Sequence, residues 1–250
     1  MSNKYVTSFI ITFLFIMIAK CKAQTTGNAV DLGLNIYWAS CNIGANSPED
    51  IGGYYAWGET DEKDYYGFNY AYLDSETSYH DIGTDISGSP YDVARVKWGG
   101  AWRMPTIDEC KELVQKCTWT WVSQNGVNGA LVTGVNGNSI FIPAGGRKYG
   151  DRGLRDFGTY GCYWSSTIES DNGYGHSSKM LLFYNNNQDV TDGRNRINGM
   201  PVRPVTNDPT GIVEIQNNKN TSIVYNLSGL RMATLKKGIN IVDGYKIIIK

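Results

Sequence analysis

The sequence of 250 residues predicts an α+β protein. A twisted antiparallel sheet with two helices is expected over residues 27–206, and a small all-β module over residues 207–250. Only two segments carry helix start and stop signals, while short β-prone runs joined by Asn-Gly turns fill most of the remaining chain. A polar stretch then precedes a terminal hairpin pattern, which separates the second module from the first.

Residues 1–23 predict a cleavable secretory signal peptide. A positive residue precedes a nearly unbroken apolar run over residues 5–18, and small residues end the segment at Ala23. The run is too short for a membrane-spanning helix, and it lacks the basic residues that would flank one. A lipoprotein signal would use Cys21, but Lys20 stands where such a site needs a small residue. We therefore expect a mature chain without a membrane span, secreted or held at the outer cell surface.

The charge of the chain excludes one class of partner. The formal net charge is −1 and the pI is about 6.1. Such a chain has no basic field that would attract phosphate backbones. We therefore expect no nucleic-acid partner.

Four cysteines remain after cleavage, an even number in a compartment that permits disulfides: Cys41, Cys110, Cys117 and Cys162. Three pairings are possible. Cys110 and Cys117 are separated by about 10 Å of rise on one predicted helix, so they should not pair with each other. We favour a bond between Cys41 and Cys117, and the alternative is a set of buried, unpaired thiols.

Two helices are expected. Residues 106–117 begin with the capping box of Thr106 and Glu109, and apolar residues then recur at i, i+3, i+4 and i+7. Ser89-Pro90, followed by Asp92, predicts the cap and first turn of a shorter helix that runs through about Val96 and ends at the glycine pair at 99–100.

The remaining elements are predicted strands and turns. Runs at 118–123, 130–134 and 139–143 form an expected antiparallel meander, whose connections contain the Asn-Gly pairs at 125–126, 128–129 and 136–137. Trp119 and Trp121 alternate onto one face of its first strand and should pack inward. Further strands are expected at 35–39, 54–57, 162–166, 179–184 and 201–205. At the C-terminus, residues 238–242 and 245–250 flank an Asp-Gly turn and predict a hairpin.

Two long polar stretches, residues 58–89 and 168–178, interrupt this scaffold. Loops of more than about 15 residues in a compact domain are usually functional or disordered. The first stretch contains five tyrosines, whereas disordered segments are poor in aromatic residues. We therefore expect functional loops.

Residues 98–106 read WGGAWRMPT and lead into a helix that carries Glu109, a pattern that resembles the signature of the Fibrobacter succinogenes major paralogous domain family. Further segments match in order and spacing, at 30–34, 38–42, 55–59, 163–166 and 202–205. The resemblance implies a fold like those of the C-type lectins and the formylglycine-generating enzymes. Such a fold has two helices, a twisted antiparallel sheet and long loops on one side.

The resemblance also implies a function. Members of the family are mostly exported or surface proteins, and relatives include the lectin-like ends of bacterial adhesins. We expect a non-enzymatic protein that binds a glycan or a surface protein and needs no cofactor. A structural, fimbria-like surface component is the alternative. A formylglycine-generating activity is disfavoured because it needs a late cysteine pair, and Cys162 is the only cysteine after residue 117.

The C-terminal tail resembles the sorting modules of secreted Bacteroidetes-type proteins. The matching segments are residues 224–229 and 237–242, with a final lysine. The tail departs from the pattern at Leu230-Arg231, where Gly-Arg is usual.

Five tryptophans lie in the motifs that the family shares whatever its ligand: Trp38, Trp57, Trp98, Trp102 and Trp164. Tryptophan could stack on sugar rings, but we expect these to form the core. Arg103 is likewise expected to be a buried or stacked structural arginine.

The candidate binding residues lie between the last two motifs, where lectin-like folds border their ligand face. Amides, carboxylates and aromatic rings are the groups that bind sugar hydroxyls and sugar rings. The candidates are Asn172, Tyr174, His176, Asn187, Asp189, Asp192, Arg194 and Arg196. The alternative is a solvated loop with turn-forming asparagines.

Metal and catalytic sites are not expected. Asn185, Asn187 and Asp189 have the 1, 3, 5 spacing of a calcium loop, but Val190 and Arg196 stand where that loop needs Gly and Glu. The chain has two histidines, neither in a zinc motif, and it lacks a Gly-x-Ser-x-Gly elbow and a P-loop.

Overall fold

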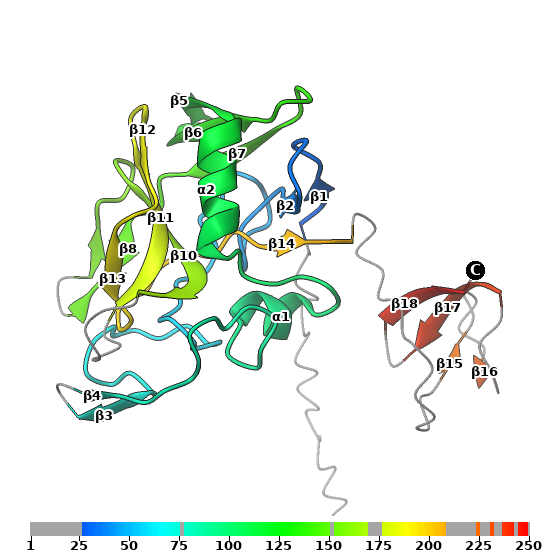
Figure 1. Ribbon diagram of the computed structural model, residues 1–250, viewed down its shortest axis with the longest axis horizontal. Coiled ribbons are helices and arrows are strands. Elements are labelled where there is room, and N and C mark those ends of the chain that lie inside the picture. The colour runs from blue at the N-terminus through cyan, green and yellow to red at the C-terminus, as the bar shows by residue number, and fades with distance from the viewer. Residues whose placement is uncertain are drawn as a thin grey trace, which may run out of the picture.

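The computed structural model describes residues 27–75, 78–150, 153–169, 177–208, 224–225, 231–232, 237–242 and 245–249. These residues form mainly antiparallel sheets with two short helices (Figure 1). The predicted signal peptide lies outside the described residues. No helix within the described residues is long and apolar enough to cross a membrane.

The sheet that organises the domain contains four strands: β10 (Gly161–Ile168), β11 (Ser177–Tyr184), β12 (Asn187–Asp189) and β13 (Gly193–Asn195). Side chains alternate between its two faces. Trp164 and its partner Met180 lie in one hydrophobic cluster, whereas Tyr163 and its partner Leu181 lie in another. The β10–β11 hairpin therefore separates two cores.

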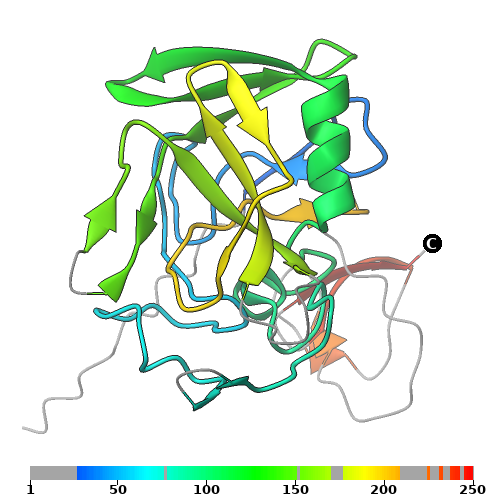
Figure 2. The ribbon, with the colours of Figure 1, turned by 60° about the vertical axis from the view of Figure 1, so that its left-hand side comes forward.

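The second of these cores is covered by α2 (Ile107–Lys116) and the meander of β5 (Thr118–Gln124), β6 (Val127–Thr133) and β7 (Ser139–Pro143), as Figure 2 shows. Both halves of the capping box of α2 are formed, which confirms this predicted helix.

Within the meander, Trp119 and Trp121 face Phe183 with ring centroids 5.5 and 6.4 Å away, as expected. The turn predicted at 128–129 is wrong, because Gly129 pairs with both neighbouring strands inside β6.

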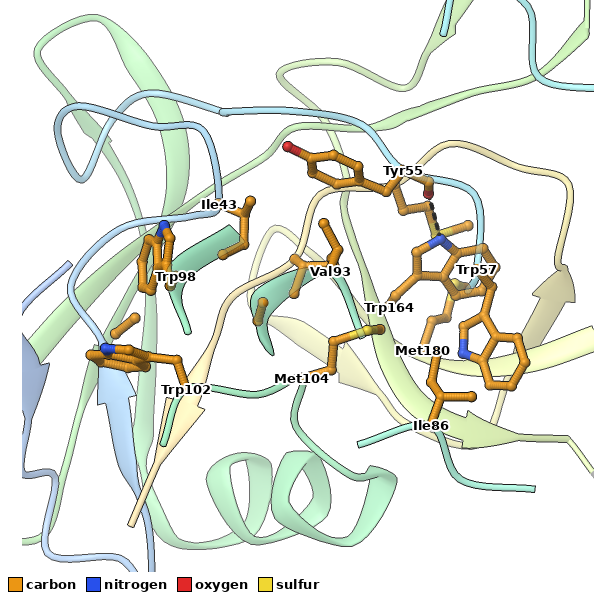
Figure 3. Close-up of a cluster of buried hydrophobic side chains, with 14 of the residues drawn as sticks. Ile43, Tyr55, Trp57, Ile86, Val93, Trp98, Trp102, Met104, Trp164 and Met180 are labelled. Carbon is orange, nitrogen blue, oxygen red and sulfur yellow. Dashed lines mark hydrogen bonds between the residues drawn. The ribbon is translucent and has the colours of Figure 1, made fainter. Parts of the chain in front are cut away.

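The first core contains most of the tryptophans, and Figure 3 shows Trp57 and Trp164 on one side of it and Trp98 and Trp102 on the other. All five motif tryptophans are buried, which confirms their predicted place in the core. Trp164 also donates a 2.9 Å hydrogen bond to the carbonyl of Tyr55.

Helix α1 (Val93–Trp98) borders this core and begins later than predicted. Its N-cap is Asp92, whose buried carboxylate accepts the backbone N–H groups of Ala94 and Arg95, while Ser89 only forms the preceding turn. The helix ends at Gly99, as expected.

A three-stranded sheet of β1 (Ala29–Val30), β2 (Tyr37–Ala39) and β14 (Val205–Thr206) joins the two ends of the domain. The strands predicted at 54–57 and 201–205 are mostly wrong. The first segment forms a single bridge, between Tyr55 and Met200, and in the second only Val205 belongs to a strand, β14. Prolines at 201 and 204 cannot donate to a strand ladder.

Two short hairpins flank the domain, β3 (Leu73–Ser75) with β4 (Ser78–Tyr79) and β8 (Arg147–Lys148) with β9 (Leu154–Arg155). The tail forms a separate sheet, in the order β16 (Arg231–Met232), β15 (Val224–Tyr225), β17 (Gly238–Val242) and β18 (Tyr245–Ile249). The β17–β18 pairing confirms the predicted terminal hairpin. Within the described residues, no strand of the tail pairs with a strand of the domain.

The predicted disulfide between Cys41 and Cys117 is wrong. All four cysteines of the described chain are free thiols. Cys41 belongs to the first core, whereas Cys117 packs against the second, so the two thiols lie in different hydrophobic clusters. The open alternative of unpaired cysteines agrees with this arrangement.

Candidate ligand-binding surface

The tyrosines of the 58–89 stretch mainly fasten that loop to the domain. Tyr66 and Tyr70 are buried and donate their hydroxyls to the backbone carbonyls of Tyr54 and Trp57. Burial raises the pKa of Tyr66 to about 12. Of the five tyrosines predicted in this loop, Tyr65 is the one that is clearly exposed.

Arg196, one of the predicted ligand-binding residues, lies in the core and is 1% exposed. Its guanidinium lies 4.6 Å from the ring centroid of Trp57 and 5.4 Å from that of Tyr79. Its Nε donates to the hydroxyl of Tyr70 at 3.2 Å. Because three aromatic rings surround it, this arginine holds the tyrosine loop against the domain rather than facing solvent.

A partly exposed aromatic pair lies at the end of the β10–β11 hairpin. The rings of Tyr160 and Tyr184 are 4.8 Å apart at 37°. Tyr160 directly precedes β10, and Tyr184 is the last residue of β11 and is 38% exposed. Tyr184 pairs with Asn187 across the turn into β12, so both side chains lie on the same face of the hairpin.

Two ion pairs lie along the β10–β11 hairpin. Arg147 and Asp156 lie near the backbone of Tyr160, whereas Arg194 pairs with Ser178, six residues along β11 from Tyr184. Arg147 Nε lies 3.3 Å from Asp156 Oδ2, and Arg194 Nη1 lies 2.6 Å from Asp192 Oδ2. All four side chains are partly exposed. Each has a small electrostatic effect on the pKa of the buried Cys162 thiol, which burial raises.

The first ion pair is tied directly to the aromatic pair. The amide of Gly146, which precedes β8, donates to the carbonyl of Tyr160 at 2.8 Å. Figure 2 shows the β8–β9 hairpin running beside the start of β10. The backbone therefore holds Arg147 next to residue Tyr160.

Asp189 completes the surface. It pairs with Leu182 across β11 and β12, so it shares a face with Tyr184 and Asn187. Its Oδ1 accepts the backbone N–H and the hydroxyl of Thr191, both at 2.7 Å. These hydrogen bonds, with a smaller contribution from Arg194, lower the pKa of this carboxyl. Asp189 is therefore an ionised acceptor at neutral pH.

We call this face the Tyr184 surface and define it by Arg147, Asp156, Tyr160, Tyr184, Asn187, Asp189, Asp192 and Arg194. Four of these were predicted from the sequence: Asn187, Asp189, Asp192 and Arg194. Arg196 lies in the core instead, and Asn172, Tyr174 and His176 lie outside the described residues.

Three of the other four members, Arg147, Asp156 and Tyr160, were missed because they come from the β8–β9 hairpin and the turn before β10, outside the segment that was considered. Tyr184 lies inside that segment but was assigned only to a strand. One signal was present. Leu181 and Phe183 alternate onto one face of the predicted strand at 179–184, which places Tyr184 on the opposite face.

The surface offers aromatic, amide, carboxylate and guanidinium groups. It does not offer a metal site, because no three metal-ligating side chains gather anywhere in the described part of the chain. Its chemistry is that of reversible recognition, in which an aromatic ring gives contact area and polar groups give orientation.

Fold and site together describe an antiparallel β domain with two short helices and a mixed aromatic and charged face at the end of its central hairpin. No family model, no curated protein and no solved structure matches this chain.

Proposed function

We propose that this protein is an exported, non-enzymatic binding protein whose C-type-lectin-like domain recognises a glycan or protein ligand through the Tyr184 surface. The single observation that carries the proposal is the aromatic pair of Tyr160 and the exposed Tyr184, with the ion pair of Arg147 and Asp156 held beside Tyr160. Ordered, partly exposed aromatic residues that are surrounded by hydrogen-bonding groups are typical of recognition surfaces.

Sequence and architecture support the fold within this proposal. The motifs at 98–106, 163–166 and 202–205 resemble the Fibrobacter succinogenes major paralogous domain family, and the two helices, antiparallel sheet and long loops agree with the fold that the resemblance implies. The signal sequence at residues 1–23 supports export.

The state of Cys162 supports a binding role over oxidative catalysis. Its side chain is buried, and burial raises the pKa of its thiol to about 12. The thiolate is the reactive form of cysteine, so this residue is a poor nucleophile at neutral pH.

The test is a binding screen with the mature chain, residues 24–250, against a glycan array and a panel of purified extracellular proteins. Tyr184→Ala should abolish or strongly weaken binding to whatever ligand is found, because it removes the exposed ring. Tyr65→Ala is the matched control, since Tyr65 is 37% exposed and lies outside the Tyr184 surface. Binding that is equally strong in the Y184A variant would place the site elsewhere.

A structural, surface-assembled component is a second candidate, favoured by the sheet of β15–β18. This sheet has its own strand order and does not pair with the described strands of the domain. Deleting residues 207–250 distinguishes the candidates. Loss of surface display with an intact domain and intact ligand binding would assign the tail a docking role, whereas unchanged display would exclude it.

A further inference from the structure

We infer that this protein forms a two-fold symmetric dimer through a patch centred on Phe68 of the 58–89 loop and Leu154 of the β8–β9 hairpin. The inference goes beyond the function proposed above, because it concerns a second surface and a second copy of this chain. Three observations carry it: the exposed apolar side chains, the contact between the two segments that hold them, and the charges on either side.

Exposed apolar side chains concentrate on these two segments. Eight large apolar side chains of the described residues are exposed, and four of them are those of Phe68, Tyr149, Leu154 and Phe157. Phe68 is 63% exposed and Phe157 is 55% exposed, whereas most aromatic residues that the structure describes are buried or half-buried. Apolar side chains that gather on a surface in this way mark an interaction site.

The backbone joins the two segments. The amide of Gly150 donates to the carbonyl of Tyr66 at 2.6 Å, and Figure 2 shows the β8–β9 hairpin beside the cyan loop. Leu154 pairs with Lys148 across the hairpin, so both side chains lie on one face of it. Because Lys148 Nζ lies 5.8 Å from the ring centroid of Tyr66, this face is turned toward the loop. The hairpin therefore presents Leu154 on the side where the loop carries Phe68.

Charges of opposite sign lie on the two sides of these apolar residues. Glu62 and Asp64 precede Phe68 in the loop, are exposed, and form no ion pair with another residue that the structure describes. Arg155 is exposed and is likewise without an ion pair among the described residues. It alternates with Leu154 along β9, so it lies on the face of the hairpin that is turned away from the loop. The apolar residues therefore lie between two carboxylates and one guanidinium.

A second copy of the chain fits such a surface. A two-fold axis places each side of a patch opposite the other side of the same patch on its partner. Arg155 then meets Asp64 of the partner subunit at two symmetric contacts, while the apolar residues pack at the centre. An aromatic centre with a polar rim is typical of protein interfaces. A lipid surface or a ligand of a single charge would match only one side of this patch.

Sedimentation equilibrium of the mature chain, residues 24–250, measures the dimer. Phe68→Ser and Leu154→Ser should each raise the dissociation constant about tenfold or more, because each removes an apolar side chain from the centre of the interface. Val135→Ser is the matched control and should leave the dimer unchanged, since Val135 is 68% exposed and lies between β6 and β7. Thermal unfolding of each variant establishes that it is folded.

Reversed charges test the two-fold arrangement. Arg155→Glu and Asp64→Arg should each raise the dissociation constant about tenfold or more, because each places like charges opposite one another at both symmetric contacts. The double variant should dimerise within about threefold of the native chain, because its pairs are restored in the opposite sense. A mixture of the two single variants should also restore a dimer, since every contact between the two chains then joins a guanidinium to a carboxylate.

Three results would overturn the inference. A mature chain that stays monomeric at millimolar concentration has no such interface. A dimer that the apolar and charge variants leave intact lies elsewhere, and its loss on deletion of residues 207–250 would assign it to the tail. A monomer that sediments with vesicles of anionic lipid, but not as Phe68→Ser, would assign the patch to a membrane. None of these results bears on ligand binding by the Tyr184 surface, which the Y184A variant tests separately.

Discussion

The Nε atom of Arg203 donates a 2.7 Å hydrogen bond to Oδ1 of Asn42, and both side chains are buried although 161 residues separate them. The other two nitrogens of the guanidinium donate to the carbonyls of Ala39 and Phe141, at 3.0 and 2.9 Å. Burial lowers the pKa of Arg203. The three oxygens that accept from its guanidinium are neutral amide and carbonyl oxygens. This arginine therefore joins β2, β7 and the last motif of the domain.

Arg203→Lys should lower the free energy of unfolding by about 2 to 4 kcal/mol, because a single ammonium cannot reach three acceptors that a planar guanidinium satisfies together. Urea unfolding measures the loss. Arg155→Lys, at an exposed position, is the control and should change stability by less than about 0.5 kcal/mol. Equal stability of the two variants would show that the buried network contributes little.

Buried tyrosines predict how stability depends on pH. Burial raises the pKa of Tyr54, Tyr55, Tyr70 and Tyr163, and raises that of Tyr66 to about 12. An unfolded tyrosine has a pKa of about 10. The folded state therefore holds these protons more tightly, so this contribution to stability is complete below pH of about 10 and is lost as the pH rises toward about 12.

Urea unfolding at a series of alkaline pH values should show this loss, in step with tyrosinate absorbance. Tyr65→Phe is the control at an exposed position and should leave the pH profile unchanged. A stability that stays constant across this range would contradict the assignment of the buried hydroxyls.

Local patterns predicted those elements whose determinants lie within a few residues of one another. The capping box of Thr106 and Glu109 marks the start of α2, and Asn125-Gly126 forms a hairpin turn with positive φ at both residues. Both signals are local hydrogen-bond or backbone preferences.

The predictions were wrong for features that depend on contacts between residues distant in sequence. Asp92 caps α1 because its second carboxylate oxygen also accepts the amide of Met104, twelve residues away. The place of Arg196 depends on rings far from it in sequence, and the Tyr184 surface depends on the β8–β9 hairpin folding beside β10. A single sequence does not reveal such contacts.

The four thiols of the described residues should react as unpaired cysteines. Cys41, Cys110 and Cys162 are buried, whereas Cys117 is partly exposed. An alkylating reagent should therefore label Cys117 first in the native protein, because it is the most accessible of the four, and should label all four after denaturation. Burial raises the pKa of all four thiols, so labelling of the native protein should be slow. Cys117→Ser should remove most of the native labelling. A disulfide-linked peptide in a non-reducing digest of the secreted protein would contradict this expectation.

The neighbouring arginines 194 and 196 should behave oppositely when each is replaced by lysine. Arg196→Lys should lower the free energy of unfolding by about 1 to 3 kcal/mol, because an ammonium cannot stack on Trp57 and also donate to Tyr70. It should leave ligand binding unchanged under conditions where the variant is folded. Arg194→Lys removes only a partly exposed ion-pair geometry, so it should change stability by less than about 0.5 kcal/mol.

Urea unfolding and the fluorescence of the buried tryptophans report the first effect. Binding of the ligand found in the screen reports the second, and there Arg194→Lys should be the weaker binder. The two positions lie on one short segment after β11, so a general disturbance of that segment would affect both variants alike. Opposite effects require that one side chain support the core while the other faces the ligand. If Arg196→Lys weakened binding without loss of stability, Arg196 would belong to the binding site despite its burial.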